Sequence, residues 1–259
     1  MDPKRLMDTA VLAGEIMLRS GAETYRVEDT MEHILKNAGA DHIETIALVT
    51  GLMATVYGDD LKPITIVKRV TDRSTNLNKI VQVNDISRRF CSGELTLDET
   101  YEALGNIKGK QYNTFVYNIA TVGVAVGFAM FFGGSPIDVL ATTAAGILLA
   151  VLTTLGKKLG VNVFILDMIS SAGIAVAAVI MKMILPGENM DIVIISAIMP
   201  LVPGVAITNA IRDTLQGDYI SGGARALEAF LKAAALALGV GIGMAVFQNM
   251  FVQGGTLWL

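Results

Sequence analysis

The chain has 259 residues, of which 53% are hydrophobic and 17% charged, and its formal net charge is −4. Neither residues 1–110 nor residues 111–259 carry an excess of Lys and Arg, which argues against nucleic acid as a partner. The single cysteine, Cys91, excludes an internal disulfide and fits a reducing compartment.

The charged residues are unevenly distributed along the chain. Residues 1–110 contain 31 of them, whereas residues 111–259 contain 13 and include about five apolar stretches long enough to cross a bilayer. This contrast predicts a cytosolic α+β domain at 1–110, followed by an all-α transmembrane domain at 111–259.

The first 110 residues show alternating helical and strand-like patterns. Ser20 and Glu23 have the spacing of a capping box at the start of a second helix, and Thr96 with Glu99 repeats that pattern. The order ααβββαα predicts helices on one face of an antiparallel sheet, whose last strand is expected to be buried on both faces. The expected helices are 3–19, a second one ending near 38, 76–91 and 96–107, and the strands are 43–49, 52–57 and 63–69.

No catalytic signature is found in the sequence. A phosphate-binding loop, an HExxH zinc motif, a GxSxG elbow and a CxxC pair are all absent, so we expect no enzyme activity, no cofactor and no metal. The second helix has a charged face that includes Glu23, Arg26 and Glu28. This face is either a solvated helix surface or a cytosolic gate or docking surface, and these interpretations stay open.

Five membrane spans are expected after residue 111. Lys157, Lys158, Arg212 and Arg225 lie near connections on one side, and the positive-inside rule places that side in the cytosol with the N-terminal domain. We therefore expect a multi-pass protein of a bacterial-type inner membrane with its C-terminus outside. The expected spans are about 114–133, 137–156, 163–185, 191–210 and 224–247.

Two glycine patterns occur in these spans. Gly123 and Gly127 form a GxxxG pair in the first span, which permits close helix packing. The run Gly239, Gly241 and Gly243 in the fifth span indicates packing or a flexible point. Glu228 and Lys232 are expected to form an i,i+4 pair.

The fourth span contains Pro200, Pro203 and Gly204 near its centre. Each proline removes a helical hydrogen bond and frees a carbonyl, which is costly in lipid unless protein, water or a ligand satisfies it. Transporters use such broken helices to bind solutes, so this segment is a candidate for binding or gating. An ordinary proline kink is the alternative.

Polar residues in and between the spans are candidates for a translocation pathway. Asp167 lies about one turn into the third span, where a carboxylate faces either a cavity or the membrane surface. The arginines after the fourth span either bind an anionic solute or simply follow the topology rule. The remaining pathway candidates are Ser170, Ser171, Asn118, Asn209, Arg212, Asp213 and Arg225.

Three segments of the chain together resemble the threonine/serine exporter family. They are Ser20–Glu28 (SGAETYRVE), Pro200–Gly204 (PLVPG), and Gly217–Tyr219 with Ala224–Arg225. The resemblance is to the N-terminal module of the two-component kind, and it covers nearly the whole chain. It implies a cytosolic domain followed by about five spans.

The resemblance also implies a function and partners. The expected function is export of small polar metabolites, such as threonine and serine or a small dicarboxylate like succinate, driven by the proton motive force. A second small membrane protein, a homo-oligomer or both are expected to supply the missing half. A membrane-anchored sensor or scaffold, and a membrane-bound hydrolase, are the alternatives.

Overall fold

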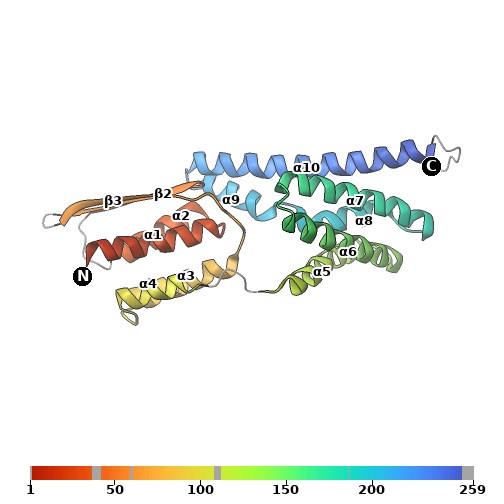
Figure 1. Cartoon of the computed structure of the whole chain (residues 1–259). Helices are drawn as coiled ribbons and strands as arrows, with labels where there is room; N and C mark the ends of the chain where they lie inside the picture. Colours follow the sequence, from red (N-terminus) through yellow and green to blue (C-terminus); the bar gives the residue numbers. More distant parts are fainter. Residues whose placement is uncertain (1, 37–41, 59–60, 108–111, 186, 253–259) are drawn as a thin grey trace. The chain divides into compact units, whose positions relative to one another are not determined.

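The computed structural model describes residues 2–36, 42–58, 61–107, 112–185 and 187–252. Within these residues it contains ten α-helices, one short 3-10 helix and three strands (Figure 1). The predicted fold class, an α+β domain followed by an all-α bundle, is therefore wrong: the chain is mostly helical and has one small sheet. The reason is that helices supply most of the core, even in the N-terminal part.

The contacts divide the chain into two compact units. The N-terminal unit consists of Met1–Gly109 with Gly204–Glu228, and the helical unit consists of Lys110–Pro203 with Ala229–Leu259. The segment Gly204–Glu228 thus packs with the N-terminal residues, although it was expected to belong to the transmembrane domain. The assignment of the units to cytosol and membrane stays a prediction.

The N-terminal unit is built around its first helix. Helix α1 packs against α2, the sheet, α3 and α4, and in Figure 1 it lies between the sheet and the α3–α4 pair. The elements are α1 (Pro3–Arg19), α2 (Thr24–Lys36), β1 (His42–Leu48), β2 (Gly51–Gly58), β3 (Leu61–Arg69), α3 (Leu77–Cys91), α4 (Leu97–Gly105), α9 (Gly204–Leu215) and the first part of α10 (Tyr219–Val252).

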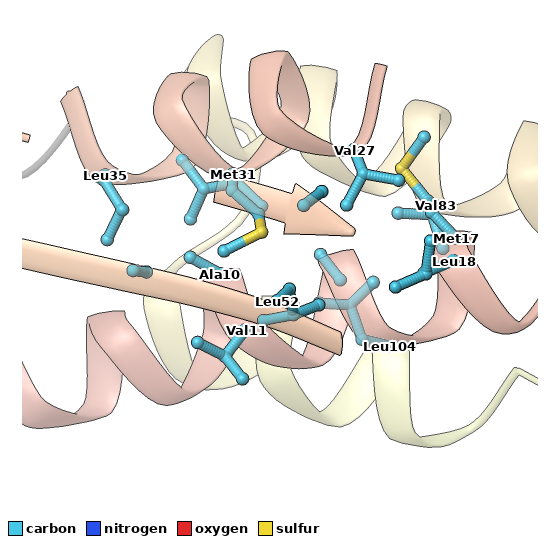
Figure 2. Packing of buried hydrophobic residues seen from close by; sticks show 14 of the residues in the cluster. Ala10, Val11, Met17, Leu18, Val27, Met31, Leu35, Leu52, Val83 and Leu104 are labelled. Carbon is cyan, nitrogen blue, oxygen red and sulfur yellow. The ribbon is translucent and has the colours of Figure 1, made fainter. Parts of the chain in front are cut away.

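The core of this unit gathers side chains from four helices and the sheet. Figure 2 shows Met17, Met31, Leu52, Val83 and Leu104, which come from α1, α2, β2, α3 and α4. Each is at most 1% exposed, and burying one such side chain contributes about 1.5–3 kcal/mol to stability. Helical periodicity in the sequence therefore accounts for most of this core.

The three strands form an antiparallel sheet in the order β1-β2-β3. Burial alternates along β2, where Leu52 and Ala54 are buried and Met53 is 38% exposed. The prediction that β3 is buried on both faces is wrong, since its Val67 is 69% exposed. Apolar side chains from the helices cover only one face of this sheet.

The two predicted capping boxes have different outcomes. The box formed by Thr96 and Glu99 is present at the start of α4. The one at Ser20 is wrong, because Ser20 is the C-cap of α1 and the second helix begins only at Thr24. Gly21, with φ +81°, lets the chain leave α1 in a left-handed conformation, so the carboxylate of Glu23 is left for other partners.

The helical unit contains the apolar helices. They are α5 (Thr114–Phe131), α6 (Pro136–Lys158), α7 (Val163–Ile184), α8 (Met190–Ile198), the 3-10 helix η1 (Met199–Leu201) and the remainder of α10. Among the described residues, four helices are long and apolar enough to cross a membrane, or up to five if α8–η1 and α9 count as one broken span. The predicted break at Pro200 and Pro203 is confirmed, since α8 ends at Ile198 and α9 starts at Gly204.

Small residues allow close packing within the helical unit. A Cβ added at Gly239 would collide with the Ser171 hydroxyl and the Met168 carbonyl of α7, and one at Gly243 would lie 2.5 Å from the Ala172 carbonyl oxygen. Among the described residues, nothing lies within 4 Å of a Cβ added at Gly123 or Gly127. Gly239 and Gly243 of α10 are therefore used for packing inside the unit, whereas Gly241 of α10 and the two glycines of α5 meet nothing described.

Candidate functional site

Charged and polar side chains from α2, α9 and α10 meet in the N-terminal unit, beside the short link between α1 and α2. We call this group the Glu23 cluster. Its members come from two segments that are far apart in the sequence. They are Glu23, Thr24, Arg26, Asn209, Arg212, Asp213 and Arg225.

Glu23 forms one centre of the cluster. Its side chain is 7% exposed, and its two carboxylate oxygens accept hydrogen bonds from Arg212 Nη1 at 2.6 Å and from Arg26 Nη1 at 3.4 Å. Burial acts to raise the pKa of Glu23, but a bond from its own backbone N–H and the charges of both arginines outweigh that effect, and the pKa is lowered. Glu23 is therefore an anion at neutral pH.

Asp213 forms the second centre. Its side chain is fully buried, and its Oδ1 accepts hydrogen bonds from Thr24 N at 3.1 Å and Thr24 Oγ1 at 2.9 Å. Its Oδ2 lies 3.0 Å from Nε of Arg225 in an ion pair. The carboxylate thus satisfies an amide at the N-terminus of α2, where the helix dipole also favours a negative charge.

Two further contacts join α9 and α10 to the link before α2. Asn209 Nδ2 donates to the Gly21 carbonyl at 2.8 Å, and Arg225 Nη2 donates to the Ala22 carbonyl at 2.6 Å. Neither carbonyl belongs to a helix, so each needs a partner when buried. The link is therefore held in place by the segment that follows the proline break.

A cavity of about 600 Å³ adjoins the cluster, and its volume lies in the range of small-molecule sites. Its lining combines polar groups of the cluster with apolar side chains of α3 and α9. The guanidinium groups of Arg26 and Arg212 are only partly covered, with side-chain exposures of 38% and 55%. The lining residues are Gly21, Glu23, Arg26, Leu77, Ile80, Val81, Gly204, Val205, Thr208, Asn209 and Arg212.

This cavity offers groups of both signs to a ligand. Arginine binds carboxylates through paired N–H groups, and Arg26 and Arg212 both have N–H groups beyond those that bond Glu23. The carboxylate of Glu23 is able to accept from an ammonium group. The arrangement suits a small solute with at least one carboxylate.

Glu28, predicted to act with Glu23 and Arg26, has another position. Its Oε1 accepts a hydrogen bond from Ala47 N of β1 at 2.8 Å, which ties α2 to the sheet. Burial raises the pKa of Glu28, and the negative charges of Asp218, Glu32 and Asp213 add to the increase, although the bond from Ala47 opposes it.

The predicted pathway residues of the first and third spans lie in the helical unit. Asp167 is 4% exposed, with Oδ2 3.6 Å from Lys232 Nζ, and Ser170 and Ser171 are buried within the next turn of α7. Asn118 of α5 has a different partner: its Oδ1 accepts a hydrogen bond from Thr154 Oγ1 of α6 at 3.1 Å.

The residues of the proline break occupy three different positions. Pro200 lies in η1, Pro203 follows it, and Gly204 is the first residue of α9 and lines the cavity of the N-terminal unit. No group of three or more potential metal ligands occurs among the described residues.

Sequence reasoning missed several partners. Lys232 was expected to pair with Glu228, but Lys232 pairs with Asp167 and Glu228 with Arg73. Asp138 was also missed, although Ser135 and Asp138 have capping-box spacing that would have indicated it. Glu188, which is 6% exposed between α7 and α8, carries no sequence signal of burial.

These features define a class of protein. Apolar helices of bilayer length, together with buried ionisable side chains between them, are the properties of a multi-pass membrane protein.

The chain belongs to the threonine/serine exporter family. The family model ThrE, described as "Putative threonine/serine exporter", matches residues 8–247. The names of the family and of the relatives below denote transport proteins and not enzymes. The resemblance drawn from the three sequence segments is confirmed, whereas the two-component arrangement stays a prediction.

Three relatives illustrate the range of the family. The chain is 24% identical to the "Probable threonine/serine exporter" of Mycobacterium tuberculosis, with 96% of this chain and 48% of the relative covered. It is 23% identical to the "Threonine/serine exporter" of Corynebacterium glutamicum, with 96% and 52% covered. It is 21% identical to the "Probable succinate transporter subunit YjjP" of Klebsiella aerogenes, with 89% and 90% covered.

The chain therefore spans about half the length of the two exporters and most of the length of the transporter subunit. No solved structure matches the chain.

Proposed function

We propose that this protein is the membrane subunit of a secondary exporter for small polar metabolites, either threonine and serine or a small dicarboxylate such as succinate. Threonine, serine and succinate, the solutes in the relatives' names, all carry a carboxylate. The observation that carries the proposal is the cavity beside the Glu23 cluster, which presents Arg26 and Arg212 to a solute of that kind.

The solute would bind in the cavity by replacing a partner in an existing ion pair. A solute carboxylate competes with Glu23 for the guanidinium of Arg212, because both are carboxylates of similar geometry. In an amino acid, the ammonium group then faces the carboxylate of Glu23. In a dicarboxylate, the second carboxylate faces Arg26. Comparing the affinities for an amino acid and for a dicarboxylate therefore shows whether the second group of the solute binds Glu23 or Arg26.

The energy source is proposed to be the proton motive force. The sequence has no phosphate-binding loop, so ATP hydrolysis by this chain has no support. We further propose that the N-terminal unit lies in the cytosol, that five spans place the C-terminus outside, and that Asp167, Ser170, Ser171 and Asn118 line the pathway. The buried positions of Asp167, Ser170 and Ser171 support their part in this assignment.

A second membrane module is proposed to complete the transporter. Two exporters are about twice the length of the matched region, and a relative of similar length is named a subunit. The second module would be a separate small membrane protein or a further part of the same polypeptide.

Efflux from loaded cells tests the proposal. Cells that produce the protein with a second membrane module would be loaded with labelled threonine, serine or succinate, and efflux would be followed over time. Arg212→Gln should abolish efflux of one solute class, whereas Arg69→Gln, which changes an exposed arginine of β3, should leave it unchanged. Wild-type efflux in Arg212→Gln would remove the cavity from the mechanism.

A sensor or scaffold is the second candidate. The cavity is formed entirely by residues of the N-terminal unit, which is an arrangement that would also suit detection of a cytosolic solute. Solute binding to the purified full chain, combined with no flux in cells with or without a second membrane module, would favour this function.

A further inference from the structure

The helical unit contains three buried acids with different surroundings. Asp138 is 3% exposed, Asp167 is 4% exposed and Glu188 is 6% exposed. A carboxylate removed from water must accept hydrogen bonds, pair with a cation or take up a proton. Among the described residues, Asp138 accepts hydrogen bonds and Asp167 pairs with a cation, whereas Glu188 has neither kind of partner.

Asp138 and Asp167 have partners that favour the charged form. Asp138 Oδ2 accepts from Ser135 N at 2.7 Å and Ser135 Oγ at 2.8 Å, and its Oδ1 accepts from Asn189 N at 2.6 Å. Asp167 lies 3.6 Å from the ammonium group of Lys232. Each partner favours the charged form of its acid, and burial opposes it.

Glu188 has no such partner. Among the described residues, neither of its carboxylate oxygens has a hydrogen-bond partner, and no ion pair includes it. The charged groups that act on it are Asp138 of α6 and Lys182, which is exposed in the last turn of α7. Asp191, three residues further along the chain at the start of α8, is also exposed. Burial raises the pKa of Glu188, and the charge of Asp138 adds to this effect while Lys182 opposes it.

Two buried hydroxyl groups extend the polar region inward. Thr142 and Ser196 are both 0% exposed, and the hydroxyl of each lacks a partner among the described residues. Thr142 lies one turn after Asp138 on α6, and Ser196 lies about 9 Å along α8, which starts two residues after Glu188 and packs against α6. Buried polar groups of this kind commonly hold ordered water.

We infer that Glu188 is a proton-binding group of the transport cycle, adjacent to Asp138, and that Thr142 and Ser196 extend its site into the helical unit. The Glu188 carboxylate takes one proton from water and becomes a neutral acid, so the pair with Asp138 changes from two negative charges to one. Return of the proton to water restores the carboxylate. This inference rests on the proposed function only in assigning the proton to transport.

The first test measures stability against pH in the purified full chain in detergent. An acid whose pKa is raised by folding stabilises the protein below its unfolded pKa, and that contribution is lost as the pH rises through the folded pKa. The unfolding temperature of the wild type should therefore fall as the pH rises above the unfolded pKa of a glutamic acid, about 4.3, and through the raised pKa of the folded state. Glu188→Gln should reduce this fall by the part that Glu188 contributes, leaving the part due to Glu28, and the control Asp191→Asn should retain the whole fall.

The second test measures coupling in inside-out membrane vesicles that contain the full chain with its second module. Glu188→Gln should lose the solute flux that a pH gradient stimulates and should retain solute exchange in the absence of a gradient. Glu188→Asp, which still titrates, should retain part of the stimulated flux, so a general packing defect at this position is distinguishable from loss of the proton site.

The outcomes separate the inference from the proposed function. A Glu188→Gln protein with the wild-type pH profile of unfolding, or with undiminished gradient-driven flux, would overturn the inference. If the wild type moves no solute and Glu188→Gln still flattens the unfolding profile, the exporter function fails while proton binding at Glu188 stands.

Discussion

Individual acids in the Glu23 cluster depend on partners that are distant in the sequence. Glu23 bonds Arg212 and Asp213 bonds Thr24, and each pair is separated by 189 positions. Both acids are buried, but Glu23 faces two partly exposed arginines, whereas the partner of Asp213 is itself buried. The energetic consequences of removing each charge should therefore differ.

Glu23→Gln should lower stability at neutral pH by about 1–3 kcal/mol, because a charged hydrogen bond is replaced and solvent screens the arginines. The pKa of Glu23 is lowered by folding, so its contribution is present above the unfolded pKa and is lost as the pH falls through the folded pKa. Chemical unfolding of the full chain at decreasing pH measures this effect. The substitution Glu44→Gln, at an exposed position, serves as the control. If Glu23→Gln lost as much stability as the wild type when the pH falls, the prediction would be contradicted.

Asp213→Asn should be more destabilising, by about 3–5 kcal/mol, because it leaves Arg225 buried without an opposing charge. A double-mutant cycle with Arg225→Gln, measured by unfolding of the full chain, should give a coupling energy of about 0.5–3 kcal/mol. Additive effects would show that the two side chains do not interact. Asp72→Asn, at an exposed position, is the matched control.

At the scale of elements, glycines with the same sequence spacing serve different purposes. Gly243 of α10 lies against the backbone of α7, whereas nothing described lies within 4 Å of a Cβ added at Gly127 of α5. Both belong to GxxxG patterns, since Gly239 precedes Gly243 and Gly123 precedes Gly127. Helix contacts, and not the motif, thus decide which glycine is essential.

Gly243→Leu should therefore lower the unfolding temperature of the detergent-solubilised chain, because overpacking costs about 1–3 kcal/mol. Gly127→Leu should leave the unfolding temperature near that of the wild type. Thermal unfolding followed by the loss of the monodisperse chromatographic peak compares the two variants. Equal effects would mean that α7 and α10 are not in close contact.

At the scale of the whole molecule, the proposed topology places the N-terminal unit in the cytosol. Cys91 is the single cysteine of the chain, and it is exposed in that unit. Burial of part of the side chain raises the pKa of the Cys91 thiol, so labelling is best carried out at mildly alkaline pH. The natural sequence thus contains its own reporter of sidedness.

A membrane-impermeant maleimide should label Cys91 only after the cells are permeabilised. In a Cys91→Ser background, Asp191→Cys introduces an exposed cysteine at the start of α8, on the predicted outer side, and should be labelled in intact cells. Labelling of Cys91 in intact cells would reverse the proposed orientation.

The sequence by itself determined the features that depend on local pattern. Apolar length predicted the helices between residues 114 and 185, the spacing of Thr96 and Glu99 predicted a capping box, and the prolines predicted the break near Pro200. Three short segments indicated the family. Only the tertiary structure decided that Gly204–Glu228 packs with the N-terminal unit, that Asp213 satisfies the start of α2, and that Asp167 pairs with Lys232. Helical periodicity and hydropathy report which face of a segment is buried, whereas the partner of a buried charge depends on chain packing between positions far apart in the sequence.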